Sequence, residues 1–363
     1  MERKSSNNTS GLIVREIKQG EKDRYNAFVA SFPTGHIFQS YEWGEVKSTS
    51  GWVPSRYVME RKREIVGAFS ILSRKFPKIN KRIFYIPCGP AMDLGDPVAV
   101  GIFGDAINDI AKKEGAVFLK IDPPVTEDRR EVKENLVAAG FKSCSDGTGS
   151  FEGIQPRCVM HLDIKGSTDD ILNHMEHKWR YNIRLAERKG VNIRTAEGKE
   201  DLKAFYKILE VTGKRDGFLI RNLGYFEKLM GSLEPEGMAK MFMADHEGKT
   251  IAATIALHFG DRCWYVYGAS GNEYRNLMPN HALQWAMIKW AKENGCPVYD
   301  FRGVPCDLEP GHPLHGLVRF KKGFGAYPVK YIGEYELKFS RFFSWLHRRG
   351  MPVYTHMRKL IRR

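Results

Sequence analysis

An order of four segments that occurs twice is the feature that most constrains this chain. Each copy begins with an apolar run rich in aromatic residues, at 83–89 and at 263–268, which leads into a polar loop and a helical pattern. Each helical pattern ends at a glycine, the usual residue for a left-handed helix cap, and an apolar run follows at 116–122 and at 297–302. The repeated order indicates a duplicated domain.

A hairpin pattern precedes each copy. Alternating apolar residues with turn residues between them occupy 57–72 and 239–257. Strand, strand, strand, helix, strand is the core order of the acetyltransferase-like (GNAT) fold. The sequence therefore predicts an α/β (α+β) chain with two tandem GNAT-like domains. No long heptad run lies between Leu202 and Pro235, so no coiled-coil arm is expected there.

Composition shifts suggest where the domains begin and end. The loop-like stretch at 146–153 separates the two copies, and residues 1–11 are polar without an apolar signal core. We predict a disordered leader over 1–11, domain 1 over 12–152 and domain 2 over 153–335. A basic helix over 336–363 is expected to pack on domain 1, and its residues suit a lipid surface, a nucleic-acid backbone or simply a solvated face.

Charge and cysteine content narrow the class further. The formal net charge of +14 favours polyanionic partners, although many stable proteins are basic without one. No stretch of about 18 uncharged apolar residues could span a membrane. The six cysteines are scattered without a C-x-x-C pair, so we expect single buried thiols and neither a disulfide framework nor a zinc site. His312 and His315 lack the partners that a metal site needs.

The loops that would bind coenzyme A in such a fold have the wrong residues. A Gly-rich turn at a helix N-terminus normally presents N–H groups to pyrophosphate. Leu277, Met278 and Pro279 occupy that position in the second copy, and the acidic stretch 93–97 occupies it in the first. Pro279 has no N–H and the bulky side chains block close approach. The sequence argues against a plain acetyltransferase, and no cofactor is expected.

Several clusters could carry chemistry or could be ordinary surface. The stretch 177–190 is strongly basic around Trp179 and Tyr181. Arg221 and Tyr225 share a face if their segment opens a helix, and strand alternation puts Tyr265 and Tyr267 on one face. For each of these, a solvated or half-buried structural role is the open alternative.

The last cluster combines a cation with aromatic residues and glycines. Lys321 follows Phe320 and lies two residues before Gly323. A cation held in this way could stabilise an oxyanion during acyl transfer. The alternative is a strand with ordinary surface lysines.

Taken together, these segments resemble the FemABX family of peptidoglycan interpeptide-bridge transferases, in its arm-less form. The matching segments are FQSYEW at 38–43 with Lys47 and Trp52, WRYNIRLA at 179–186, YGAS at 267–270, RNLMPN at 275–280, QWAMIKW at 284–290 and FKKGFG at 320–325. The resemblance implies twin GNAT-like domains without coenzyme A and an aminoacyl-tRNA donor. The implied acceptor is the stem-peptide amine of UDP-MurNAc-pentapeptide or lipid II.

The resemblance also implies roles for individual residues. Lys321 and Phe320 match the pair at the donor end, where the lysine would stabilise the oxyanion, and Asp122 matches a carboxylate near the acceptor amine. The remaining matches are substrate-binding residues, with Lys47 and Arg221 as the pair that grips the diphosphate and two cleft tyrosines among them: Lys47, Arg221, Tyr225, Tyr267, Trp43, Asn280 and Arg302.

The function expected from these observations is aminoacyl transfer to a peptidoglycan precursor, without a metal. We expect a cytoplasmic enzyme with peripheral contact to the anionic inner face of the membrane. Two alternatives stay open at this point: a coenzyme A-dependent N-acyltransferase, and a non-catalytic module that binds tRNA or membrane.

Overall fold

The computed structural model describes residues 11–76, 79–144, 153–306 and 313–340. The chain divides into two units, the first formed by Met1–Asp146 with Ile332–Arg363 and the second by Gly147–Tyr331. The predicted leader falls almost entirely outside the described residues. The chain thus leaves the first unit near the predicted boundary, builds the second and returns to the first.

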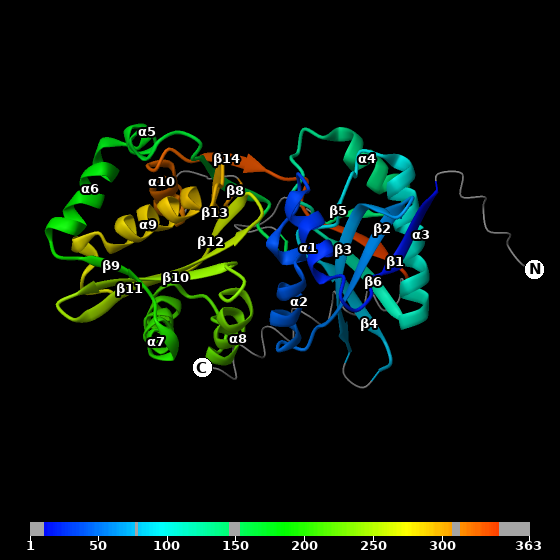
Figure 1. Cartoon of the computed structure of the whole chain (residues 1–363), viewed down its shortest axis with the longest axis horizontal. Helices are drawn as coiled ribbons and strands as arrows, with labels where there is room; N and C mark the ends of the chain where they lie inside the picture. Colours follow the sequence, from blue (N-terminus) through cyan, green and yellow to red (C-terminus); the bar gives the residue numbers. More distant parts are fainter. Residues whose placement is uncertain (1–10, 77–78, 145–152, 307–312, 341–363) are drawn as a thin grey trace, which may run out of the picture. The chain divides into compact units, whose positions relative to one another are not determined.

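The first unit contains a sheet in the order β1-β2-β3-β4-β6-β15-β7, with β5 paired to β3. Its strands are β1 (Leu12–Glu16), β2 (Val53–Arg61), β3 (Glu64–Lys75), β4 (Arg82–Ile86), β5 (Ala91–Met92), β6 (Ala116–Ile121), β7 (Lys142–Ser143) and β15 (Tyr335–Lys338). Its helices are α1 (Lys22–Ser31), the 3-10 turn η1 (Ile37–Gln39), α2 (Tyr41–Ser48), α3 (Pro97–Glu114) and α4 (Arg130–Ala138). Helices α1 and α2 cover one face of this sheet, and α3 and α4 cover the other (Figure 1).

Helix α3 illustrates how the sequence builds this layer. The Asp96 side chain caps its N-terminus, Pro97 occupies the first turn, and Gly115 ends it in the left-handed conformation at φ 70°. Its apolar side presents Phe103, whose ring meets Phe69 of the sheet edge-to-face at 5.1 Å between centroids. Burial of this side stabilises the layer.

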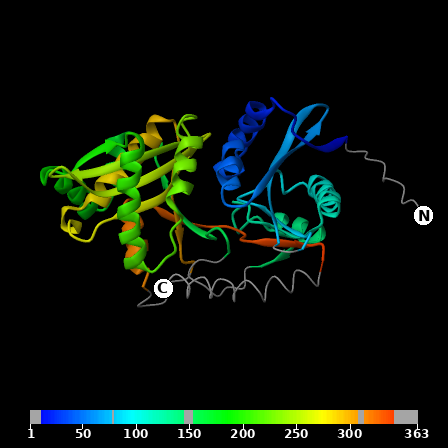
Figure 2. The ribbon, with the colours of Figure 1, turned by 90° about the horizontal axis from the view of Figure 1, so that it is seen from below.

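The second unit has a sheet in the order β14-β8-β13-β12-β11-β10-β9. Its strands are β8 (Cys158–Asp163), β9 (Asn192–Thr195), β10 (Ala239–His246), β11 (Lys249–Phe259), β12 (Arg262–Ser270), β13 (Val298–Val304) and β14 (Tyr327–Lys330). Its helices are α5 (Thr168–His174), α6 (His177–Arg188), α7 (Gly198–Asp216), α8 (Leu223–Leu233), the 3-10 turn η2 (Arg275–Leu277), α9 (Pro279–Glu293) and α10 (His315–Lys322). Helices α5, α6, α9 and α10 lie on one face, and α7 and α8 on the other (Figures 1 and 2).

The predicted duplication of a GNAT-like core is confirmed. Each unit runs through an antiparallel meander, a helix and a strand parallel to the end of the meander, with β4 parallel to β6 and β12 parallel to β13. Gly115 and Gly295, at φ 70° and 74°, both adopt the left-handed conformation that was expected. Helix α8 begins soon after α7 ends, so no coiled-coil arm is inserted there.

One strand in each sheet comes from the far side of the chain's crossing between units. In the first unit β15, which follows the whole second unit in sequence, lies between β6 and β7. In the second unit the same slot, between β13 and β14, is filled by β8, which directly follows the first unit. The predicted helix over 336–363 is therefore wrong over residues 336–338, because Tyr335 and Leu337 enter the first core as strand residues. Residues 341–363 lie outside the described residues.

The cysteine prediction is correct in part. Cys88, Cys263 and Cys296 are free and buried. Cys158 and Cys306, however, form a disulfide across 148 residues of sequence. The expectation of six single thiols is wrong because antiparallel pairing of β8 with β13 places Val304 opposite Cys158 and so brings Cys306 within reach.

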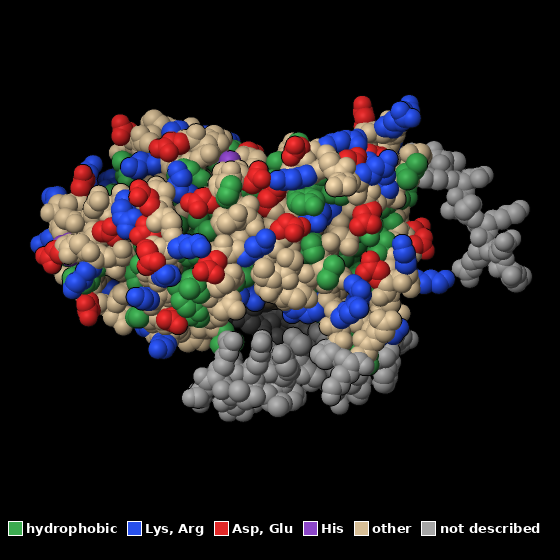
Figure 3. All heavy atoms as spheres, turned by 60° about the horizontal axis from the view of Figure 1, so that its bottom comes forward, with side chains coloured by type: hydrophobic (Ala, Val, Ile, Leu, Met, Phe, Trp, Pro, Cys, Tyr) green, Lys and Arg blue, Asp and Glu red, His purple; other side chains and the backbone are tan. Residues whose placement is uncertain are grey.

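The surface carries both charges. On the face that Figure 3 shows, Lys and Arg side chains lie among Asp and Glu side chains and do not form one basic patch. None of the helices in the described part of the chain has both the length and the apolar composition of a membrane span. Within the same residues, no three His, Cys, Asp or Glu side chains lie together as a metal ion would require.

Candidate functional site

The two parallel central strands of the second unit separate along their length. Strands β12 and β13 pair only from Arg262–Val298 to Trp264–Asp300, although β12 continues to Ser270 and β13 to Val304. Past this point β13 has an irregular register against β8, between Asp300 and Gly303. Arg302 has φ 63°, a conformation that non-glycine residues adopt at a cost in free energy. The backbone of β13 is thereby redirected at Arg302 and Gly303.

The redirected carbonyl groups hold the side chain of Lys321. This residue of α10 is only 3% exposed, and its Nζ donates hydrogen bonds to the carbonyl oxygens of Arg302 (3.1 Å) and Gly303 (2.7 Å). An ammonium has three N–H donors, so these bonds leave one for another group. Burial lowers the pKa of Lys321 to about 7, against the opposing effect of the Asp300 charge. We call Lys321 with these two carbonyls the lysine cradle.

Asp300 lies beside the lysine cradle. Its side chain is buried, and Oδ1 accepts a hydrogen bond from the Arg302 backbone N–H at 2.5 Å. Its Oδ2 lies 3.5 Å from Nε2 of His161, which is also 3.2 Å from the Tyr331 hydroxyl. Burial by itself would raise the pKa of Asp300, but the contact with His161 and the Arg302 charge outweigh it and lower the pKa. Asp300 is therefore a buried carboxylate that stays ionised.

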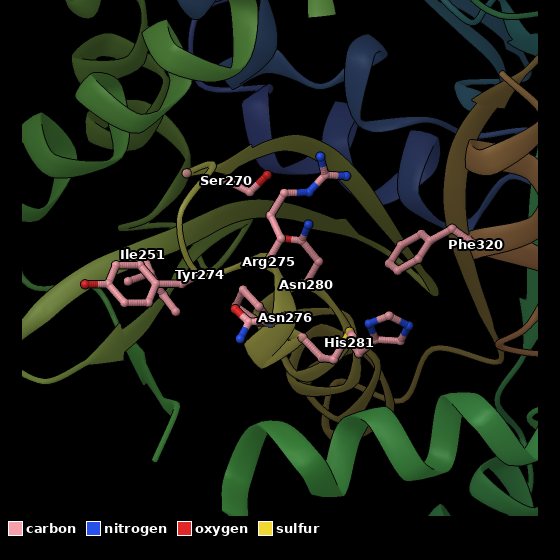
Figure 4. Close-up of a pocket in the computed structure, with 11 residues that line it drawn as sticks. Ile251, Ser270, Tyr274, Arg275, Asn276, Asn280, His281 and Phe320 are labelled. Carbon is pink, nitrogen blue, oxygen red and sulfur yellow. The ribbon is translucent and has the colours of Figure 1, made fainter. Parts of the chain in front are cut away.

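Phe320, the neighbour of Lys321, lines a pocket of about 440 Å³ at the N-terminus of α9. Figure 4 shows Phe320 and His281 on one side of this pocket, with Arg275, Asn276 and Asn280 beside them. The full lining is Ile251, Ser270, Gly271, Tyr274, Arg275, Asn276, Met278, Pro279, Asn280, His281 and Phe320. The pocket thus offers an aromatic wall and several amide or guanidinium groups.

Helix α6 fixes the aromatic wall of the pocket. The indole N–H of Trp179 donates to the Phe320 carbonyl at 2.9 Å, and its ring meets His281 edge-to-face at 5.7 Å. Gly323 is required here, because a Cβ on it would lie 2.1 Å from the Trp179 ring. Burial lowers the pKa of His281 to about 4, so the Asn182 amide donates to a neutral imidazole at 3.1 Å.

The N-terminus of α9 differs from an open phosphate cradle. Met278 is left-handed at φ 56°, Pro279 supplies no N–H, and the His281 N–H donates to the Met278 carbonyl at 3.0 Å. The residues expected to spoil a pyrophosphate site do stand in the first turn and just before it. This geometry is unfavourable for coenzyme A.

The predicted residues Arg221, Tyr225 and Tyr267 form a second cluster, on the face of the sheet that α8 covers. The hydroxyls of Tyr225 and Tyr267 lie 3.0 Å apart, and the exposed Arg221 guanidinium lies 5.5 Å from the Tyr225 ring centroid. Arg221 precedes α8, whose N-terminus Asn222 caps, so the two residues meet without sharing a helix face.

One expected arrangement of this cluster is wrong. Tyr265 and Tyr267 do not share a face, since a bulge in β12 opposite Ile255 and Ala256 reverses the alternation. Tyr265 packs against the core beneath α9, whereas Tyr267 contacts Phe226 of α8.

The three predicted residues of the first unit have firm local partners. Trp43 of α2 is buried and stacks on Phe38 at 4.2 Å, and the Lys47 ammonium lies 5.7 Å from the Trp43 ring centroid. Asp122, directly after β6, accepts hydrogen bonds from the Tyr85 hydroxyl and the Cys88 N–H, both at 2.6 Å. Asp122 therefore has a structural role at the end of β4 in addition to any role in chemistry.

Sequence reasoning missed two residues of the second-unit site. His281 was seen only as the start of an apolar helix, and His161 was not considered. Adjacent to Asn280 and the broken phosphate turn, His281 could have been selected by position. His161 carries no local signal, because its contact with Asp300 depends on the pairing of β8 with β13.

Comparison with known proteins decides the family. The FemAB family model matches residues 21–245 and 234–348. The chain belongs to the FemAB family. The FemABX resemblance predicted from the sequence is thereby confirmed. This FemAB protein is 30% identical, over 86% of its own length and 90% of the relative's, to a lipid II:glycine glycyltransferase of Staphylococcus aureus.

Solved structures agree with this assignment. The FemAB chain is similar to the crystal structure of FemX, with a TM-score of 0.83 and 28% identity over 92% of this chain and 99% of that one. A tandem GNAT protein from the clavulanic acid biosynthesis pathway matches with a TM-score of 0.55 and 10% identity, over 90% of this chain and 98% of that one. This second likeness concerns the fold alone, and it agrees with the tandem GNAT-like architecture.

Proposed function

We propose that this FemAB protein is an aminoacyltransferase that moves an amino acid from aminoacyl-tRNA to the stem-peptide amine of a peptidoglycan precursor, in the formation of the interpeptide bridge. Support comes from its relative in Staphylococcus aureus, whose name specifies lipid II as acceptor and which it matches over 90% of that protein's length. Lipid II is our preferred acceptor over the soluble UDP-MurNAc-pentapeptide. The enzyme would then work in the cytoplasm with peripheral contact to the inner face of the membrane.

The lysine cradle beside an aromatic pocket is the observation that carries the proposed donor site. Phe320 lines the pocket and Lys321 is held on the Arg302 and Gly303 carbonyls directly after it. The charged 3′ end of tRNA binds in this pocket, against Phe320 and near Asn280. The third N–H of the Lys321 ammonium donates to the ester carbonyl oxygen as negative charge develops there.

The chemistry needs no covalent enzyme intermediate, because the tRNA ester is already activated. The acceptor amine attacks the ester carbonyl carbon and a C–N bond forms. The tetrahedral oxyanion, stabilised by Lys321, collapses as the bond between carbon and the ribose oxygen breaks. The proton lost by the amine leaves to solvent or to Asp122, and the ribose oxygen departs as a hydroxyl. Alignment of two large substrates supplies much of the rate.

The acceptor is recognised through its phosphates. Lys47 and the exposed Arg221 are each proposed to bind diphosphate oxygens, a task for which a guanidinium is well suited. Tyr225 and Tyr267 support Arg221 from α8 and β12, and Trp43 positions Lys47. Arg302, whose side chain contacts Gln155 at 2.6 Å, is proposed as a further substrate contact.

A coenzyme A-dependent N-acyltransferase is the main rival, favoured by the fold alone. The first turn of α9, with Pro279 and the engaged His281 N–H, argues against it. Titration with acetyl-CoA in a thermal unfolding assay separates the two, since tight binding raises the unfolding temperature. We expect no rise. A module that binds tRNA or membrane without catalysis would show binding and no transfer.

Transfer of label tests the proposal directly. The purified protein is incubated with a pool of radiolabelled aminoacyl-tRNAs and with lipid II or UDP-MurNAc-pentapeptide. We expect label in lipid II, and none when the charged tRNA pool is treated with ribonuclease beforehand. Label that enters either acceptor only from acetyl-CoA would overturn the proposal.

A further inference from the structure

We propose that Asp300, oriented by His161, is a positioning residue that builds the lysine cradle and keeps the Lys321 ammonium charged and fixed. The catalytic consequence of this role rests on the proposed function. The geometric part does not, because it concerns only contacts within the second unit. Asp300 itself lies behind the cradle and is not expected to touch substrate.

The first step of the argument concerns the backbone. Arg302 adopts φ 63° within β13, a conformation that needs compensation. The hydrogen bond from its N–H to Oδ1 of Asp300, two residues earlier, provides it, as in other turns stabilised by an aspartate side chain. This local turn directs the Arg302 and Gly303 carbonyls at the Lys321 Nζ. Without the acceptor at Asp300 the turn relaxes and the cradle loses its shape.

The second step concerns charge. Lys321 is buried, so its protonated form depends on nearby negative charge. Asp300 and Arg302 of β13 act on it with opposite signs, Asp300 favouring the ammonium and Arg302 opposing it. Asp300 is in turn faced by His161 of β8, which Tyr331 contacts. Only the ammonium form of Lys321 can donate hydrogen bonds to the two carbonyls and to an oxyanion together.

The third step concerns orientation. One carboxylate oxygen of Asp300 serves the Arg302 N–H, and the other faces Nε2 of His161. The imidazole is itself held near the Tyr331 hydroxyl at 3.2 Å. His161 thus fixes the rotation of the carboxylate so that Oδ1 stays on the backbone turn.

Two substitutions separate shape from charge. Asp300→Asn keeps an acceptor oxygen for the turn and removes the charge, whereas Asp300→Ala removes both. We expect Asp300→Asn to move the alkaline fall of kcat to lower pH, because Lys321 then loses its proton more readily. We expect Asp300→Ala to lower kcat roughly 10- to 100-fold at all pH values, the loss typical of a hydrogen bond to a charged group. The KM for lipid II should not change in either variant. A pH profile for Asp300→Asn that matches the wild type would overturn the proposal.

A measurement of stability tests the same contact without substrates. Because the pKa of Lys321 is about 7 in the folded chain and its model value is 10.5, the unfolded chain binds more protons between these values. The free energy of unfolding therefore rises with pH in this window, and Lys321→Met removes that rise. In the Asp300→Asn background, the stability difference between proteins with and without Lys321→Met should begin at lower pH. An onset at the same pH in both backgrounds would refute an effect of Asp300 on Lys321.

Controls keep the outcomes distinct. Asp261→Asn, an exposed aspartate just before β12, should leave both the pH profile and the stability difference unchanged. If Asp300→Asn does not fold, His161→Gln replaces it and should shift the alkaline limb in the same direction. An unshifted limb in that variant would also count against the proposal. If the wild-type protein transfers no amino acid and the stability shift is still seen, the proposed function fails and the positioning role stands.

Discussion

The two units share one sheet order, yet their central parallel strands behave differently. In the first unit β4 and β6 stay paired from Arg82 to the last residue of β4, Ile86. In the second unit β12 and β13 part after Trp264 and Asp300. Duplication thus preserved the scaffold while only one copy opened its centre. The open copy is the one that holds the lysine cradle and the pocket beneath α9.

A buried aspartate marks the difference in each unit. Asp122 follows β6 and ties it to the end of β4 through the Tyr85 hydroxyl and the Cys88 N–H. Asp300 lies within β13 and bonds to its own strand at Arg302, which frees the next carbonyls for Lys321. The same residue type closes one sheet and shapes a site in the other. We infer that the second unit is the donor side of the enzyme.

Removal of Lys321 should have the largest effect. Lys321→Ala is expected to reduce kcat about 10²- to 10³-fold, the usual loss when one oxyanion donor is removed, with little change in the KM for lipid II. Steady-state transfer assays measure both constants. The matched control is the exposed neighbour Lys322, whose change to Ala should leave kcat within about twofold. Equal kcat values for the two variants would contradict the role given to Lys321.

The glycine behind the pocket comes next. Gly323→Ala would place a Cβ 2.1 Å from the Trp179 ring and force α6 and α10 apart. We expect a loss of about 1–3 kcal/mol in the free energy of unfolding, measured by urea denaturation, with weaker transfer. Gly316→Ala in the same helix meets nothing within 4 Å and should be neutral or stabilising by up to about 1 kcal/mol. The contact is disproved if the two variants are equally stable.

The first-unit aspartate gives the contrasting test. Asp122→Ala leaves the Tyr85 hydroxyl and the Cys88 N–H without their carboxylate and should destabilise the chain by roughly 1–3 kcal/mol. Faster hydrogen exchange at the Cys88 amide would locate the change at the end of β4. The exposed Asp105 of α3 serves as the control, since its change to Ala should alter neither quantity. Unchanged exchange at Cys88 would mean that Asp122 does not close the sheet.

The smallest expected effect belongs to the exposed cation of the second cluster. Arg221→Ala should raise the KM for lipid II about tenfold without a comparable fall in kcat, as expected for a lost phosphate contact. The dependence of KM on salt concentration should weaken as well. Lys228→Ala, on the same helix that Arg221 precedes, is the control. A fall in kcat alone would place Arg221 with the chemistry instead.

Much of this architecture could be predicted from local sequence. The repeated order of strands, helix and glycine cap predicted both GNAT-like cores, because those signals depend on residues close in the chain. The spoiled phosphate turn at Leu277, Met278 and Pro279 was equally visible. Phe320 and Lys321 were selected from their motif, although the burial of the lysine was not foreseen.

The parts that escaped prediction depend on contacts between distant segments. The Cys158–Cys306 disulfide and the approach of His161 to Asp300 both follow from the pairing of β8 with β13. The placement of β15 in the first sheet requires the chain to return from the second unit. The opposite faces of Tyr265 and Tyr267 come from a bulge, which alternation of residue types does not reveal.

The location of the donor end tests the difference between the units most directly. The protein is irradiated with a tRNA charged with a photoreactive amino acid, and the crosslinked peptides are identified by mass spectrometry. The account predicts crosslinks in the second unit, within residues 274–281 or at Phe320. Crosslinks confined to the first unit would contradict the assignment of the open sheet as the donor side.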